Sequence, residues 1–460
     1  MFIFPLIYIF SFLFALKDIF KGSKQAFFLF LIFGLSIYTT AMSVAFQYGF
    51  KNSISILQSF KELIIIGLLA YLFWTYKAYT RLHFIDYAIA AYFSYTLIYA
   101  LLPIGDQDFL SRMIAFKGTS FFLLVYLTGR LFDPVKVFIN KYFLFILILA
   151  VATAAVVVLE VLSNQHLQSI SGYADYNYYF FNFEKSGNYE LTWTFETEGG
   201  FKRFAGFFAN PLEHAGATLI SLSIILSLYT DDQERFKPDR FGWVAIVGTL
   251  ISIFFAISRA SFISYFLIIY VYARLSNKKV IIKLAHTGAA VFIIYLIVLF
   301  TKDNYTNNGL QEMIINTLNF SNSSSIGHLV EWVQGLTSMV DYPLGLGLGT
   351  SGRVAGSLGE NIGGENQFII VGVQLGVIAL AIYIAIYTSI IRTAKFWYSR
   401  LAGKEKKVCL AILLIKIGFI IPLFTSELES SPYLSYMIWF LTGIFVAIIS
   451  VKDKKAAPNV

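Results

Sequence analysis

Two arginines in the middle of the chain, Arg203 and Arg259, border long apolar stretches and stand outside the clusters that hold most of the other basic residues. A charge so close to the hydrocarbon is costly, so such a residue usually has a function and a partner. A guanidinium group forms two parallel, charge-assisted hydrogen bonds with a phosphate. We therefore interpret the pair as candidate ligands for a phosphate or diphosphate. The alternative is that each arginine pairs with a carboxylate or extends to lipid headgroups.

His328, Glu331 and Glu365 are ionisable residues that could accept a proton, and all lie in the long segment 301–365. His328 and Glu331 are three positions apart, so they would share one face of a helix. Glu365 directly precedes the apolar run that begins at Asn366-Gln367-Phe368, which would hold it at the membrane rim. His328 and Glu331, each taken alone, fit a solvated charge better than a catalytic group.

Two short motifs predict how the backbone approaches this region. Asn210-Pro211 is a typical helix start, with asparagine as the cap and proline in the first turn. The positive end of that helix would point toward Arg203. The segment from Tyr342 to Arg353 contains a letter match to a dinucleotide motif at 347–352, but no strand-turn-helix unit surrounds it. We interpret Gly345 and Gly347 instead as a turn where backbone approaches a ligand or the membrane surface.

The composition limits the class of protein that can position these residues. With 57% hydrophobic and 13% charged residues, the 460-residue chain is not an ordinary soluble domain. Apolar runs of spanning length predict an all-α, polytopic membrane protein with about 12–13 transmembrane helices and a helical extracytoplasmic loop domain. The thirteen predicted spans are 1–16, 26–47, 56–76, 84–103, 109–129, 142–162, 208–229, 241–257, 260–275, 281–300, 366–390, 408–424 and 432–450.

Lysine and arginine predict the orientation of the chain. If thirteen spans alternate, most basic residues fall in connections on one side, which is expected to be the cytoplasm. The first residue then lies outside, whereas twelve spans would place it inside. The net charge of +8 is explained by this topology, so no nucleic acid partner is predicted. Asp106-Gln107-Asp108 matches a metal-binding D-x-D by letters, but in so short a loop a solvated turn is favoured, and no metal site is predicted.

The predicted spans divide the chain into five parts: N-terminal helices 1–162, an aromatic loop 163–207, central helices 208–300 with the arginine motifs, a cap 301–365, and C-terminal helices with a cytoplasmic tail 366–460. In the cap we expect an amphipathic segment at Leu310–Phe320 and helical periodicity at Ile326–Val340. The aromatic residues of Tyr173–Thr197 fit either a membrane-interface belt or a platform for sugar rings. There is no internal repeat and no pair of broken helices, which argues against a secondary transporter.

Four motifs, in order and spacing, resemble the O-antigen ligase and polymerase superfamily of bacterial envelopes, which are membrane glycosyltransferases of GT-C type. They are Arg203-x-x-Gly206-x-x-x-Asn210-Pro211, Ser258-Arg259, Gly327-His328-x-x-Glu331-Trp332 with Pro343-x-Gly345-x-Gly347, and Glu365-Asn366-x-Phe368 followed by Gly376. The resemblance covers about residues 200–380. It differs at two points, because ligases have a histidine where this chain has Glu365, and the family often has an arginine where this chain has His328.

The resemblance implies a polymerase that joins undecaprenyl-diphosphate-linked repeat units into O-antigen, capsular or exopolysaccharide chains at the periplasmic face of the inner membrane. Arg203 and Arg259 would hold the diphosphate, and Glu365 would accept the proton of the acceptor hydroxyl, with His328 as second choice. Asn210, Asn366, Glu331, Gly345, Gly347 and Arg353 would bind substrate. The reaction would need no metal and no cofactor. The expected partners are lipid-linked oligosaccharides, membrane lipids and a chain-length regulator protein.

Two other functions stay open. An O-antigen ligase would use the same donor and a different acceptor, such as the lipid A core; Glu365 argues against it. A flippase or other transporter of lipid-linked sugars would have charged residues around a central cavity inside the membrane. Lys61, Arg112, Lys117 and Lys416 are candidates for such charges.

Overall fold

The computed structural model describes residues 1–75, 82–197, 199–301, 323–358 and 361–456. Within these ranges the protein is all-α, and its β structure is limited to two isolated bridges. The helices are α1 (Ile3–Phe20), α2 (Phe27–Leu29), α3 (Tyr38–Gln47), α4 (Lys51–Thr75), α5 (Phe84–Leu101), α6 (Phe109–Arg130), α7 (Ile139–Ser163), α8 (Leu167–Ile170), α9 (Tyr173–Phe181), α10 (Pro211–Leu228), α11 (Arg240–Ala256), α12 (Arg259–Leu275), α13 (Lys279–Thr301), α15 (Ser323–Asp341), α16 (Gly352–Leu358), α17 (Gln367–Tyr398), α18 (Gly403–Gly418), α19 (Ile420–Thr425) and α20 (Pro432–Ala456).

The helices confirm a multi-pass membrane protein. Eleven stretches of the described chain are long and apolar enough to cross a membrane, and α11 is a shorter apolar helix. Each of the thirteen predicted spans coincides with helix, including the 17-residue α12. The second span is irregular, because a π-helical turn at Phe30–Gly34 and a 3-10 turn at Leu35–Ile37 separate α2 from α3.

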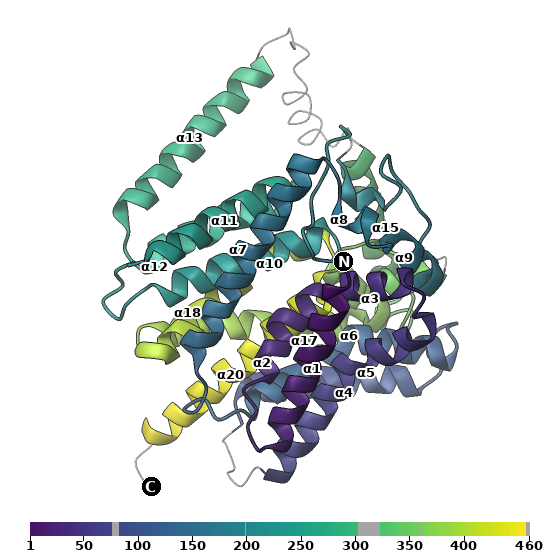
Figure 1. Cartoon of the computed structure of the whole chain (residues 1–460), viewed down its shortest axis with the longest axis horizontal. Helices are drawn as coiled ribbons and strands as arrows, with labels where there is room; N and C mark the ends of the chain where they lie inside the picture. The colour runs from purple at the N-terminus through teal and green to yellow at the C-terminus, as the bar shows by residue number, and fades with distance from the viewer. Residues whose placement is uncertain (76–81, 198, 302–322, 359–360, 457–460) are drawn as a thin grey trace.

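The buried centre of the bundle is formed by α10 and α20. In their apolar spanning stretches, 89% and 94% of the residues are buried. α20 lies directly against α6 because glycines face backbone on both sides: Gly129 faces the carbonyl of Phe440, and Gly443 faces that of Tyr126. Small residues allow this close approach between spanning helices. By contrast, α13 is set apart from the bundle (Figure 1) and contacts α12 through Tyr270 and His286, whose side-chain O and N atoms are 3.2 Å apart.

A break in α17 is the feature that the sequence analysis did not predict. Gly376 lies inside this helix with φ 77° and ψ 178°, a conformation essentially restricted to glycine. The break frees backbone groups, and the segment after α15 satisfies them: Leu346 N–H donates to Val373 O over 2.8 Å, and Val377 N–H donates to Pro343 O over 2.9 Å. Non-helical backbone is tolerated in a membrane only where protein satisfies it in this way.

The two ends of the bundle differ in character. Contacts among the basic connections gather them at one end: Lys404 Nζ donates to Val137 O (3.4 Å), Lys406 pairs with Glu234 (3.6 Å) and Lys452 pairs with Glu405 (2.8 Å). The aromatic helix α9 and the cap helix α15 lie at the opposite end from the last residues of α20 (Figure 1). This arrangement agrees with the alternation predicted from lysine and arginine.

The cap is only partly described. α15 covers the predicted helical segment Ile326–Val340 and begins earlier, at Ser323. Its first residues are the serines that precede the predicted segment, and serine is favoured at helix starts. The predicted amphipathic segment Leu310–Phe320 lies outside the described residues.

Candidate functional site

The segment that carries Arg203 is held in place by the end of α7 and the start of α8. The Gly206 N–H donates to Oε2 of Glu160 over 2.9 Å. Gln168 Nε2 donates to the carbonyls of Gly206 and Phe208 over 2.9 and 2.8 Å. Glu160 and Gln168 are both buried. Because buried amide and carboxylate groups fix this backbone from two sides, the position of the segment is defined before any ligand binds.

Arg203 itself is half-buried between the aromatic loop and the end of α11. Its backbone N–H donates to Phe195 O over 2.9 Å, and its side-chain Nε donates to Ala256 O over 3.1 Å. Burial and the nearby Arg259 together lower the pKa of Arg203 to about 10, and Glu365 opposes this shift. The guanidinium therefore stays charged at neutral pH and has both a cation and a carboxylate near it.

Arg259 is the first residue of α12 and is exposed. The Ser258 side chain does not cap this helix; its hydroxyl instead contacts Ser261 Oγ at 3.2 Å. The first N–H groups of α12 therefore add partial positive charge next to the Arg259 side chain. Arg203 and the start of α12 together make one positive region at the end of the bundle that carries the cap.

His328 and Glu331 lie on one face of α15, as their spacing predicted. His328 Nδ1 is 3.6 Å from Glu331 Oε2, and both side chains are partly exposed. The pKa of His328 is raised, mainly by its interaction with Glu331 and also by the charge of Glu365, whereas burial and Arg259 oppose the rise. α15 thus brings an acid-base pair next to the two arginines.

Glu365 lies at the start of α17 and completes the group. Its side chain keeps exposed surface, yet surrounding protein desolvates it and raises its pKa. Exposed surface and a raised pKa occur together when water can reach a carboxylate that protein encloses on most sides. The charges of His328 and Arg203 lower this pKa, and that of Glu331 raises it. Glu365 is therefore a carboxylate whose basicity is increased and which is next to a guanidinium.

These five residues come from four separate segments: the loop before α10, the start of α12, α15, and the start of α17. Each influences the ionisation of at least one of the others. Two guanidinium groups beside a raised carboxylate can bind an anion and accept a proton in one place. We call Arg203, Arg259, His328, Glu331 and Glu365 the charge cluster.

The two asparagines predicted to bind substrate have a structural role at helix starts. Asn210 Oδ1 accepts from the N–H groups of Leu212 and Glu213, so the predicted cap of α10 is confirmed. Asn366 is buried, and its Oδ1 accepts from Phe368 N–H over 3.0 Å at the start of α17. Because Asn366 caps the start of α17, the backbone of the preceding Glu365 is held at that helix start.

Gly345 and Gly347 closely approach backbone of the protein itself, and their approach to a ligand or to the membrane surface stays a prediction. A side chain at Gly345 would meet the N–H of Gly376 and the carbonyl of Gln374, and one at Gly347 would meet the carbonyl of Ile104. The glycines therefore allow the segment to seal the break in α17. The sequence predicted a close backbone approach at these two glycines, but it did not identify the backbone that they approach.

Arg353 lies beside the charge cluster rather than in it. Its guanidinium lies 5.2 Å from the Phe181 ring and 5.5 Å from the Phe183 ring, and its backbone N–H donates to Glu427 Oε2 over 2.6 Å. Burial raises the pKa of Glu427 to about 7, with Arg353 lowering it and Glu365 raising it. Glu427 is a buried carboxylate near the charge cluster that the sequence alone did not single out.

The aromatic loop is largely a packed unit. Tyr173 and Phe195 are buried together, and the buried Tyr176 accepts from Gln58 Nε2 over 2.9 Å. Trp193 and Phe201 remain 69% and 66% exposed. Only exposed rings such as these can contact a membrane interface or a sugar. The membrane-belt and sugar-platform interpretations therefore apply to fewer residues than the sequence suggested.

Three of the four charges proposed for a transporter form ion pairs or hydrogen bonds with protein groups, and the fourth, Lys416, packs on an aromatic ring. Lys61 and Lys117 each lie 3.1 Å from Glu62 Oε1. Arg112 donates to the carbonyls of Ala100 and Gln107 over 3.4 and 3.1 Å. Lys416 lies over the Trp439 ring at 3.8 Å. They therefore form separate local contacts.

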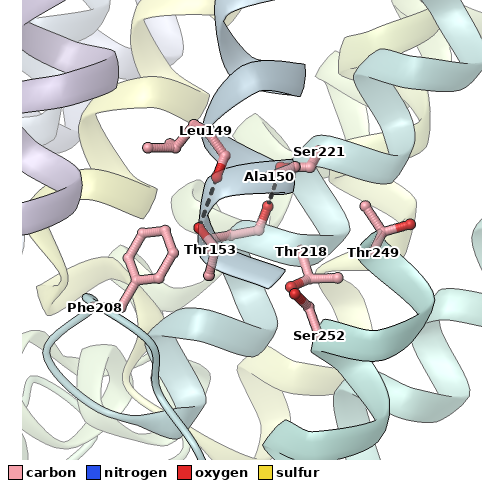
Figure 2. Close-up of a pocket in the computed structure, with 9 residues that line it drawn as sticks. Leu149, Ala150, Thr153, Phe208, Thr218, Ser221, Thr249 and Ser252 are labelled. Atoms are coloured by element: carbon pink, nitrogen blue, oxygen red, sulfur yellow. Dashed lines mark hydrogen bonds between the residues drawn. The ribbon is translucent and has the colours of Figure 1, made fainter. Parts of the chain in front are cut away.

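A small pocket lies among α7, α10 and α11 and is also lined by Phe208 (Figure 2). Thr153, Thr218 and Ser221 donate to carbonyls one turn earlier in their own helices. The space holds about one water molecule. It contains no charged side chain, and its hydroxyls serve helix packing, so we do not assign the chemistry to it.

The chain matches no protein-family model and no curated protein.

Proposed function

We propose that this protein is a membrane glycosyltransferase that polymerises oligosaccharide repeat units carried on undecaprenyl diphosphate, at the periplasmic face of the bacterial inner membrane. The observation that carries the proposal is the charge cluster. Arg203 and Arg259 lie near each other and near Glu365, although they come from three separate segments. This is the arrangement that a diphosphate leaving group and an acceptor hydroxyl require.

In the proposed reaction, the acceptor sugar hydroxyl attacks the anomeric carbon of the donor glycan. The new C–O glycosidic bond forms as the bond between that carbon and the diphosphate oxygen breaks. Glu365 takes the hydroxyl proton, and the two guanidinium groups stabilise the negative charge that develops on the diphosphate. Removing one such donor typically costs about 10²–10³ in rate.

The roles of the other cluster residues follow from their charges. His328, paired with Glu331, would hold a positive charge near the donor phosphate, because its pKa is raised. His328 is also the second choice for the proton acceptor. The exposed rings of the aromatic loop would stack on sugar rings.

Deleting the gene in its source organism and sizing the surface polysaccharide on a gel tests the proposal. A polymerase predicts that single repeat units remain and that long chains disappear until the wild-type gene is restored. Long chains that remain on the lipid carrier would instead identify a ligase. Repeat units trapped on the cytoplasmic side would identify a flippase.

A further inference from the structure

Lys416 is a buried cation that the charge cluster does not use. It lies in the spanning stretch Gly403–Thr425 and is 1% exposed. Its Nζ lies 3.8 Å from the centre of the Trp439 ring and 4.6 Å from that of Tyr387, and has no hydrogen-bond partner. An ionisable group inside a membrane is costly enough that a partner of opposite charge is expected.

Glu429 is that partner. It lies in the short turn Leu428–Ser430 between α19 and α20, and its Oε1 accepts from Trp439 Nε1 over 3.0 Å. Its Oε2 is buried without a hydrogen-bond partner. Burial raises the pKa of Glu429, whereas the charge of Lys416 lowers it. The two charges therefore act on each other without direct contact.

Two tyrosine hydroxyls share this environment. Tyr92 on α5 and Tyr383 on α17 have ring centres 5.9 Å apart, and both interact electrostatically with Glu429. The Tyr92 hydroxyl is buried without a hydrogen-bond partner, and the Tyr383 hydroxyl lies within reach of the Glu429 carboxylate. Lys416 and Glu429 contact the same Trp439 side chain, Lys416 over its ring and Glu429 at its Nε1, so Trp439 holds the two charges near each other.

We propose that Lys416 and Glu429 form an ion pair across the Trp439 side chain within the helix bundle, and that this pair fixes the turn 426–431 for the candidate site. The turn contacts two elements that flank that site. Glu427 accepts from the Arg353 backbone at the start of α16, and Ser431 Oγ donates to Glu213 Oε1 on α10 over 2.7 Å. Lys416 and Glu429 are thus positioning residues; their part in the reaction rests on the proposed function.

Labelling of a cysteine placed on the turn tests the pair without assuming any activity. The single native cysteine, Cys409, is buried, so a Ser430→Cys variant gives a specific site for a membrane-impermeant maleimide. Asn52→Cys, in exposed α4 near the same end, is the control. Each is measured with Lys416→Met, with Glu429→Gln and with both changes.

A released turn should raise the labelling rate of Ser430→Cys by about an order of magnitude and leave Asn52→Cys unchanged. The double change leaves no lone buried charge, so it should regain the thermal stability that either single change loses while labelling stays fast. Equal labelling of Ser430→Cys in all backgrounds would overturn the proposal. A parallel rise at Asn52→Cys would show general loosening and would overturn it too.

Polymer formation separates the positioning role from the proposed function. In the double variant, the rate at saturating donor should fall while half-saturation stays the same, because the turn orients site groups rather than binding donor. Fast labelling with a normal rate would reject the positioning role and keep the ion pair. If the wild-type protein made no polymer, the proposed function would fail and the labelling result would still stand.

Discussion

Arg203 and Arg259 lie near each other, and the positive charge of Arg259 contributes to the lowered pKa of Arg203. Two like charges repel, and burial makes the repulsion stronger because less water screens it. An anion between them would remove this penalty. A diphosphate, with its multiple negative charges, would gain most from such a site.

Replacement of either arginine should abolish most of the proposed activity. We expect Arg203→Ala and Arg259→Ala each to reduce polymer formation by about a hundredfold or more, because a charge-assisted donor to the leaving group is lost. Arg203→Lys should recover only part of it, since an ammonium lacks the planar fork. Polymer length and amount in complemented cells measure the effect.

Lys185→Ala is the matched control for these variants. Lys185 pairs with Asp175 over 2.8 Å in the aromatic loop, outside the charge cluster. The Lys185→Ala substitution removes one positive charge from the end of the protein that carries the charge cluster. If Lys185→Ala lost as much polymer as Arg203→Ala, general electrostatics would explain the result better than a diphosphate site.

Glu365→Gln should remove the acid limb of the pH-rate profile. The pKa of Glu365 is raised above its ordinary 4.5, mainly by burial. The carboxylate is the proton acceptor, so wild-type activity is full above this raised pKa and falls as the pH drops through it. The amide variant should be slower by about a hundredfold and flat across the same window. An acid limb that persists in Glu365→Gln would assign it to another group.

His328 should contribute stability only at lower pH. Its pKa is raised above its ordinary 6.5, mainly by Glu331. The protonated form is therefore favoured in the folded protein, and the contribution is complete below pH 6.5 and lost as the pH rises through the raised pKa. We expect wild type to melt about 1–2 °C above His328→Gln at pH 6, with no difference at high pH. A difference that grows with pH would contradict this sign.

Gly376→Ala tests the break in α17. A side chain here would lie 2.5 Å from Pro343 O, in a conformation that costs non-glycine residues about 1–3 kcal/mol. We expect lower thermal stability and loss of activity. Gly67→Ala, at a position in α4 with open space around it, should have little effect. Equal tolerance of both changes would mean that α17 is not broken in the working protein.

The fold was largely predictable because membrane burial leaves a direct signature in the sequence. Each apolar run became a helix, since a chain in lipid must satisfy its own backbone. The break at Gly376 was not predictable, because its satisfying partner is the Pro343–Gly349 segment earlier in the chain. Hydropathy reports how apolar a segment is and says nothing about a loop that returns to it.

The site was predictable in part. Arg203, Arg259 and Glu365 were identified because each charge borders an apolar run, and His328 and Glu331 because of their helical spacing. Glu160, Gln168 and Glu427 were missed, since a carboxylate or amide near a helix end is ordinary in sequence. Their importance comes from partners such as the Gly206 and Arg353 backbone, which only the fold brings near.

Direct binding of a lipid diphosphate tests the central claim, that the two arginines hold the donor diphosphate. Purified wild-type protein in nanodiscs would be titrated with undecaprenyl diphosphate and with undecaprenyl monophosphate. We expect the wild-type protein to bind the diphosphate more tightly than the monophosphate. Arg203→Ala and Arg259→Ala should each bind the diphosphate at least about tenfold more weakly than wild type, and Lys185→Ala should bind it as wild type does. Equal Kd values for wild type and both arginine variants would contradict it.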